Sequence, residues 1–263
     1  MAEKIISSAS HKVTNEVIFK LITERINKKS LILDFGAGQG HMCQKIGDYF
    51  LHKGIDPKDR IFACEIVPEI FKYTKIKCQK ISKDSVIPFQ DKTFDLIYTI
   101  EALEHFKRPY DFFDEAYKKL NAGGYLIFSV PNILHFKSRL NFLLTGFGNM
   151  FGPSSIAIKN AGRICGHIMP LNYAFFNYGL RNSGFQNLKF HSDRRKRSSL
   201  FLSCIFYPFL KLGSIMYEKS LKKYDYEVWE ENREVVYKMN SLDMLSSISC
   251  IMVAQKNSLS QSP

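Results

Sequence analysis

Residues 31–40 read LILDFGAGQG, an apolar run that ends in an acid and is followed by three glycines within five positions. A strand that is buried on both faces of a parallel sheet needs such an apolar run. Glycine leaves the backbone bare, so the chain can turn sharply there and lie close against a ligand. The stretch therefore predicts a buried strand, a ligand-binding turn and the start of a helix near residue 39.

Apolar strand patterns alternate with amphipathic helix patterns after this point. We expect strands at residues 30–35, 60–65, 76–80, 94–100, 125–130, 185–191 and 249–255, and helices at 13–26, 39–50, 68–73, 109–120 and 171–182. Strands that alternate with helices are joined by right-handed crossovers and form a parallel sheet. The pattern predicts an α/β fold.

The length and composition of the chain suit one large domain. Its 263 residues are 45% hydrophobic, which is enough for a substantial core, so we interpret residues 1–263 as a single domain. The amino terminus shows no secretory signal, and the six cysteines are scattered without a C-x-x-C pair. We expect a cytoplasmic protein with reduced thiols.

Two segments interrupt the alternation. Residues 132–170 are rich in glycine and proline, and we interpret them as a partly helical insertion that covers the substrate. Residues 192–247 form a longer excursion that is both basic and apolar. Between residues 193 and 223, eight basic residues face two acids, so this stretch holds half of the net charge of +12.

The role of the 192–247 excursion stays open at this stage. Its apolar run, residues 200–217, contains Pro208 and Lys211, which argue against a membrane span. It can form a helical pair packed on the core or on a second subunit. It can also lie, through residues 194–223, on the inner face of an anionic membrane. Contact with nucleic acid has less support, because no known module or interleaved aromatic residues accompany the basic run.

The glycine loop suits two ligand classes, a dinucleotide or S-adenosylmethionine. The dinucleotide fingerprint G-x-G-x-x-G, started at Gly36, requires glycine where this chain has His41. Asp34 would repel a pyrophosphate but suits a cationic amino group. The loop therefore favours the sulfonium cofactor over a nicotinamide dehydrogenase.

LILDFGAGQG resembles the first motif of the class I S-adenosylmethionine-dependent methyltransferases, and IPFQDKTFDLI at residues 87–97 resembles a later segment of that family. The resemblance implies a Rossmann-like sheet of seven mostly parallel strands, with helices on both faces, an antiparallel last strand and helical insertions. It also implies that Glu65 binds both ribose hydroxyls, since a carboxylate can accept from both groups of a diol. The cofactor-binding residues implied in all are Asp34, Gly36, Ala37, Gly38, Gly40, Glu65, Ile66, Asp84 and Glu101.

The segment TIEALEH, residues 99–105, follows the fourth predicted strand, at the edge where open α/β sheets bind ligands. His105, helped by Glu104, can act as a general base. A similar E-x-x-E-H occurs in ubiquinone-biosynthesis O-methyltransferases and in small-RNA ribose methyltransferases. That resemblance implies a divalent metal as an alternative, held by Glu101, Glu104, His105 and His167, with His135 a weaker candidate. A third interpretation is that Glu104 and His105 only brace the loop, and we do not expect a metal.

Residues 130–132, 138–146, 166–168 and 183–185 resemble bacterial methyltransferases of surface-glycan assembly. This implies that Asn132, His135, Arg139 and Tyr173 face the acceptor. We expect O-methylation of a glycan, lipid-linked or other hydroxyl-bearing acceptor. The alternatives are a metal-dependent small-molecule (quinone-type) or RNA ribose O-methyltransferase, and a noncatalytic cofactor-binding scaffold.

Overall fold

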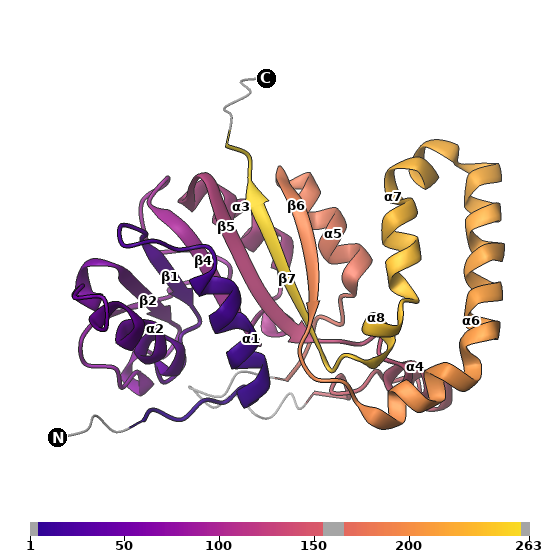
Figure 1. Cartoon of the computed structure of the whole chain (residues 1–263), viewed down its shortest axis with the longest axis horizontal. Helices are drawn as coiled ribbons and strands as arrows, with labels where there is room; N and C mark the ends of the chain where they lie inside the picture. Colours follow the sequence, from indigo (N-terminus) through magenta and orange to yellow (C-terminus); the bar gives the residue numbers. More distant parts are fainter. Residues whose placement is uncertain (1–4, 155–165, 259–263) are drawn as a thin grey trace.

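The computed structural model describes residues 5–154 and 166–258, and its centre is a sheet of seven strands in the order β3-β2-β1-β4-β5-β7-β6 (Figure 1). The strands are β1 (Ile32–Phe35), β2 (Ile61–Glu65), β3 (Cys78–Lys80), β4 (Phe94–Ile100), β5 (Leu120–Pro131), β6 (Phe185–Ser192) and β7 (Ser249–Lys256). The first five run parallel, and β7 lies antiparallel between β5 and β6. The predicted Rossmann-like fold with an antiparallel last strand is confirmed.

Helices cover both faces of the sheet, because neighbouring strand residues point to opposite sides. Ile32 joins a core cluster with α1 (Lys12–Thr23) and α2 (His41–Leu51). Leu33 joins a second cluster with α3 (Pro109–Lys119) and α5 (Tyr173–Asn182). Apart from Asp34, the strand run is apolar because each face of the sheet has its own core.

Two predicted elements differ in the structure. The helix expected at 68–73 is a short 3₁₀ turn, Pro68–Ile70, because the following residues extend and pack on α2, where Phe71 lies against Gly40. The strand expected at 125–130 begins earlier, at Leu120, so the glycine-containing stretch 121–124 belongs to β5. Leu120 already pairs with Phe94, and the register shifts before Tyr125 pairs with Leu96. Residues 121–124 therefore form a β-bulge within β5.

The two interruptions carry the remaining helices. The first holds α4 (Phe136–Thr145), and part of it, residues 155–165, lies outside the described residues. The second folds into α6 (Arg197–Tyr224), α7 (Tyr226–Met239) and α8 (Leu242–Ser246). Figure 1 shows α6 at the outer edge of the molecule, with α7 between it and the rest of the fold.

Helix α6 continues through Pro208 and Lys211, the two residues that argued against a membrane span in the sequence. Among the residues that the structure describes, it is the one helix long and apolar enough to cross a membrane by length and composition. Only 11% of its most apolar window is buried. A helical pair is therefore present, but α6 is not buried against the core.

Candidate functional site

The glycine loop joins β1 to α2 at the carboxyl edge of the sheet. Gly38 has φ +53°, and a side chain added there would meet nothing within 4 Å. Gly40 has φ +90°, and an added Cβ would lie 2.8 Å from Cε2 of Phe71. Gly40 thus permits the tight start of α2, while Gly38 leaves bare backbone facing open space, as a closely bound ligand requires.

A cavity of about 610 Å³ opens beside this loop. Eight residues predicted for the cofactor, the catalytic step or the metal line it: Asp34, Gly36, Ala37, Gly38, Glu101, Glu104, His105 and His167. The topology explains this, because β1 and β4 are neighbours and their carboxyl ends meet at one edge. Gly40, Glu65, Ile66 and Asp84 do not line the cavity.

Glu65 ends β2 beside the glycine loop. Its Oε2 accepts from the Gly38 N–H at 2.7 Å, and its Oε1 accepts from the Ile66 N–H at 2.7 Å. Each carboxylate oxygen can accept a further hydrogen bond. Glu65 therefore braces the loop and keeps the capacity to bind a diol there.

Asp34 is buried under the same loop. Its Oδ2 accepts from the Tyr98 hydroxyl at 2.8 Å and from the Cys43 thiol at 3.2 Å. Burial raises the pKa of Asp34 to about 7, against the opposing effect of the bonds from Cys43 and Tyr98. The approach of a cationic group favours the ionised form of such a buried carboxyl, so Asp34 would interact favourably with a cation.

Glu101 and Glu104 follow β4. Glu101 has φ +50°, an unusual conformation for a non-glycine residue, and its N–H donates to the Ser129 carbonyl at 3.0 Å. Burial raises the pKa of Glu101 to about 7. Glu104 belongs to the 3₁₀ turn η3 (Leu103–His105), and burial together with the charge of Glu101 raises its pKa to about 9.

Both side-chain oxygens of Glu104 are buried and have no hydrogen-bond partner among the described residues. Buried polar atoms are nearly always satisfied in proteins, so such an orphan points to a missing partner. The backbone of the same residue is well used: its carbonyl accepts from Ile168 at 2.9 Å and from Met169 at 3.1 Å. These bonds bring the insertion against η3.

The same contact brings His167 to His105. Their ring centroids lie 4.8 Å apart, edge to face. His105 Nδ1 lies 2.9 Å from the Gly166 carbonyl, which only accepts, so Nδ1 carries the proton and Nε2 keeps its lone pair. Burial and the charge of His105 lower the pKa of His167, and its Nδ1 has no partner in the described chain.

One ligand atom from each of Glu104, His105 and His167 lies within 4.8 Å of the others. A carboxylate with two imidazoles suits a divalent cation, and the orphaned oxygens of Glu104 would gain a partner. The residues therefore fit a metal ion. Glu101 lines the same cavity but does not belong to this compact group.

Other predicted residues have structural surroundings. Asp84 accepts from the Lys107 N–H at 2.7 Å and ties two loops together, and Ile66 is 45% exposed. His135 lies outside the group of Glu104, His105 and His167, and its Nδ1 caps α4 by accepting from the Ser138 N–H. Asn132 donates to the carbonyls of Met244 and Ser247, and Tyr173 packs in the core, so neither faces an acceptor. Arg139 lines a different, apolar cavity.

The sequence analysis missed the amino-terminal part of this wall. The polar stretch before α1 passes over the glycine loop, where the Ile6 N–H donates to Gln44 and the Ile6 carbonyl lies 2.6 Å from His41 Nδ1. Cavity-lining residues from missed positions are Ser7, Ser8, Ser10, His11, Asn15, Arg194 and Ser249. Short polar side chains without periodicity carry no sequence signal for such a role.

A family of methyltransferase domains matches residues 10–189, more than half of the chain and the whole of the glycine loop and η3. The chain belongs to this methyltransferase family. It is a class I S-adenosylmethionine-dependent methyltransferase, and S-adenosylmethionine is its cofactor. Membership in a family of enzymes also argues against the dehydrogenase and scaffold alternatives.

Similar proteins agree with this methyltransferase assignment. A malonyl-[acyl-carrier protein] O-methyltransferase of Marinomonas is 26% identical over 42% of this chain and 43% of its own length, so the match spans less than half of that relative. An Archaeoglobus fulgidus SAM-dependent methyltransferase superposes with a TM-score of 0.54, at 16% identity over 92% of this chain and 94% of its own. A Haemonchus contortus phosphoethanolamine N-methyltransferase, solved with S-adenosylhomocysteine, gives 0.54 at 12% identity over 97% and 55%.

Proposed function

We propose that this methyltransferase methylates a hydroxyl oxygen of a glycan or lipid-linked acceptor. The observation that carries the proposal is the convergence of Glu104, His105 and His167 in the cavity that the glycine loop borders. A hydroxyl is a weak nucleophile until a base removes its proton, whereas a neutral amine already has a free electron pair and needs no such base. A cavity that presents a poised imidazole thus suits an alcohol.

His105 is the base in this proposal. Its Nδ1–H is held by the Gly166 carbonyl, so Nε2 is free to accept a proton. S-adenosylmethionine supplies an electrophilic methyl group on a positively charged sulfur. Nε2 of His105 would take the proton of the acceptor hydroxyl as its oxygen is methylated.

Glu104 and Asp34 have supporting roles. With its pKa raised to about 9, Glu104 is neutral at pH 7 and donates a hydrogen bond to the acceptor rather than removing its proton. Asp34 lines the same cavity and attracts the cationic amino group of the cofactor. The amino-terminal stretch and the insertion close over the two ligands and exclude water.

A metal-assisted version is the second candidate, favoured by the orphaned carboxylate of Glu104 beside two imidazoles. A bound cation would lower the pKa of the acceptor hydroxyl directly, as in metal-dependent small-molecule or ribose methylation. Glu104 would then be ionised and His105 would be a ligand. The two versions assign opposite protonation states to Glu104.

The test is methyl transfer from isotope-labelled S-adenosylmethionine to alkyl glucosides, an amine and a fatty acid, with the methylated atom located by NMR. We expect an O-methyl ether of the glucoside. A methyl ester or a methylamine as the main product would overturn the hydroxyl assignment; the Marinomonas relative, an O-methyltransferase of malonyl-[acyl-carrier protein], is the reason for the carboxylic-acid arm. Repeating the assay in EDTA, and then with Mg²⁺ or Mn²⁺, separates the base from the metal version.

A further inference from the structure

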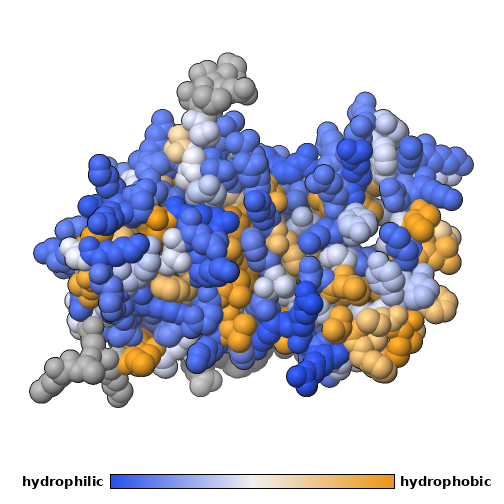
Figure 2. All heavy atoms as spheres, in the orientation of Figure 1, coloured by the Kyte–Doolittle hydropathy of each residue, from blue (hydrophilic) through white to orange (hydrophobic). Residues whose placement is uncertain are grey.

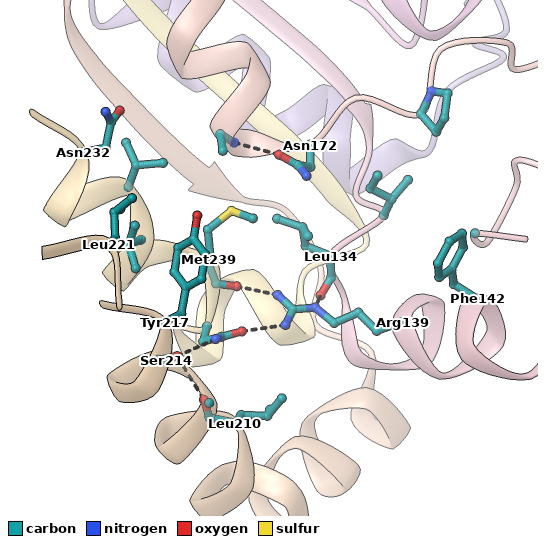
Figure 3. A pocket seen from close by; sticks show the side chains of 18 of the residues that line it. Leu134, Arg139, Phe142, Asn172, Leu210, Ser214, Tyr217, Leu221, Asn232 and Met239 are labelled. Carbon is teal, nitrogen blue, oxygen red and sulfur yellow. Dashed lines mark hydrogen bonds between the residues drawn. The ribbon is translucent and has the colours of Figure 1, made fainter. Parts of the chain in front are cut away.

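A second, larger cavity of about 1100 Å³ lies away from the glycine loop, enclosed by α4, α6 and α7 (Figure 3). Its lining is mostly apolar: Leu134 and Phe142 face Phe209, Leu210 and Leu221 of α6 and Val228, Val235 and Met239 of α7. A volume of this size matches the pockets that hold small molecules. The cavity has the chemistry of a hydrocarbon-binding site.

Arg139 links two of the helices that line this cavity. Figure 3 shows its guanidinium turned toward the end of α7, where it donates to the Met239 carbonyl and Asn240, while Nε donates to the Leu134 carbonyl at 2.8 Å. These bonds fix α4 to the end of α7. On the α6 side, Ser214 donates to the Leu210 carbonyl at 2.9 Å. Arg139 and Ser214 are therefore hydrogen-bonded within the protein, and the rest of the lining is mostly apolar.

The cavity opens on an apolar surface. Phe142, Phe209 and Tyr217 line the cavity and are nevertheless 62%, 72% and 60% exposed, so they form its rim. Along α6 an exposed stripe follows the spacing of one helical face: Phe201, Ile205, Phe209, Leu212 and Met216. Figure 2 shows the apolar surface gathered at the α4 and α6 corner, beside strongly hydrophilic atoms. Monomeric soluble proteins rarely expose so large a patch.

Basic residues border the stripe at both ends. Residues 194–197 precede it, and Lys219 and Lys223 continue its spacing beyond Met216. Four of the eight acids of the excursion lie on α7, which Figure 1 shows inside α6, and one lies on α6. Apolar side chains inserted among acyl chains, with Lys and Arg at the headgroups, are the arrangement of a helix that lies on an anionic membrane.

The two cavities share a wall. Phe151 lines the apolar cavity, and its ring centroid lies 5.3 Å from that of His167, which lines the polar one. Neighbouring wall residues also divide between the cavities, with Met150 on the polar side and Gly148 on the apolar side. The polar and the apolar cavity are therefore neighbours, and an amphiphilic molecule that used both would place its polar end near His105 and its chain between α6 and α7, across this wall.

We propose that α4, α6 and α7 form a lipid-docking unit: the α6 stripe rests on an anionic leaflet, and the cavity takes the hydrocarbon chain of the acceptor drawn from it. This inference rests on the proposed function for the identity of the reacting group. The occupant is a long acyl or isoprenoid chain. The contact is peripheral, because α6 stays packed against α4, α7 and α8.

Gly213 provides the sharpest test of the chain site. It lines the cavity, and a Cβ added there meets nothing within 4 Å, so Gly213→Ala adds a methyl group without a clash and is the matched control for Gly213→Leu, which occupies more of the cavity. The probe is cis-parinaric acid, titrated against the full chain by fluorescence. We expect saturable binding that Gly213→Leu weakens by about tenfold or more and that Gly213→Ala preserves. Absent saturable binding, or equal binding by Gly213→Leu, overturns the chain site.

Vesicle co-sedimentation tests the surface. Leu212→Gln, 57% exposed on the stripe, is compared with Leu51→Gln, 40% exposed on α2 at the other end of the sheet. We expect binding to phosphatidylcholine vesicles that contain phosphatidylglycerol, little binding without it, release by salt, and a loss with Leu212→Gln only. Self-association that Leu212→Gln abolishes, without vesicle binding, would assign the stripe to a second copy, and resistance to alkaline extraction would assign α6 to a span; either overturns the proposal.

These two assays use neither cofactor nor methyl transfer. If the chain binds parinaric acid and vesicles but methylates no hydroxyl, the proposed acceptor chemistry fails while the lipid-docking unit stands. If it methylates short alkyl glucosides as well as long ones and binds neither probe, the reverse holds. Circular dichroism of each variant confirms that it is folded before binding is compared.

Discussion

The imidazole of His105 lies 4.8 Å, centroid to centroid, from that of His167, although the two residues belong to different loops. Hydrogen bonds hold the chain on both sides of His167. The Gly166 carbonyl bonds to His105, and the Ile168 N–H donates to the Glu104 carbonyl. The polar cluster therefore exists only when the insertion lies against η3. The contact that places residues 166–168 beside the cavity is thus the same contact that brings His167 to His105.

We predict that His105→Gln lowers kcat by about 100-fold or more, because glutamine cannot accept the proton at pH 7. His167→Gln, which keeps a polar group in place, should lower kcat by less than about tenfold. Affinity for S-adenosylhomocysteine, measured by calorimetry, should be the same in both variants. If both variants lose kcat to the same large extent and EDTA inhibits the wild type, the two histidines would instead belong to a metal centre.

Glu65→Gln should weaken binding of S-adenosylhomocysteine by about 10- to 100-fold, since a charged acceptor for the ribose diol becomes a neutral one. The amide oxygen can still accept from the Gly38 N–H, but the amide NH2 cannot accept from Ile66, so the melting temperature should fall modestly. Glu69→Gln, an exposed acid nearby, is the control. Unchanged nucleoside affinity in Glu65→Gln would remove Glu65 from the ribose site.

Asp34 predicts a pH dependence of stability. Burial raises its pKa from 3.8 to about 7, so between these values the native chain keeps a proton that the unfolded chain loses. The free energy of unfolding should therefore fall as the pH rises toward 7 and level off above it.

Asp34→Asn cannot ionise and should lose this component, about 1–3 kcal/mol, when urea unfolding at pH 5 is compared with that at pH 8. The exposed Asp48→Asn should keep the wild-type profile. Part of the slope should remain, because the pKa values of Glu101 and Glu104 are also raised. A slope as steep in Asp34→Asn as in the wild type would mean that Asp34 contributes none of it.

The local patterns of the sequence predicted the parallel sheet and the glycine loop. The strand at 94–100 is correct at both ends, because a run of apolar residues buried on two faces has few other solutions. The TIEALEH segment was placed correctly at the carboxyl edge for the same reason, since a strand fixes where its end must lie.

Features that depend on distant contacts were not predictable. Nothing near Ser7 or Ser10 indicates that they border the cavity, because only the fold brings them over the glycine loop. Histidine is a common metal ligand, but the ring of His135 caps the start of α4 instead. Pro208 and Lys211 argued against a membrane span, yet one long apolar helix runs through both, because a proline removes one hydrogen bond without forbidding the next turn.

Two helical glycines with ordinary backbone angles should respond in opposite ways to alanine. At Gly47 of α2, an added Cβ would lie 2.0 Å from the hydroxyl oxygen of Tyr73, and Tyr73 is buried under the loop that follows β2. Gly47→Ala should lower the free energy of unfolding by about 1–3 kcal/mol, since the ring must move within a packed core. At Gly213 of α6 there is open space, and Gly213→Ala should raise it by about 0.5–1 kcal/mol through helix propensity alone. Urea unfolding of the two variants checks both signs, and a stabilised Gly47→Ala would show that the packing of Tyr73 on α2 is looser than described.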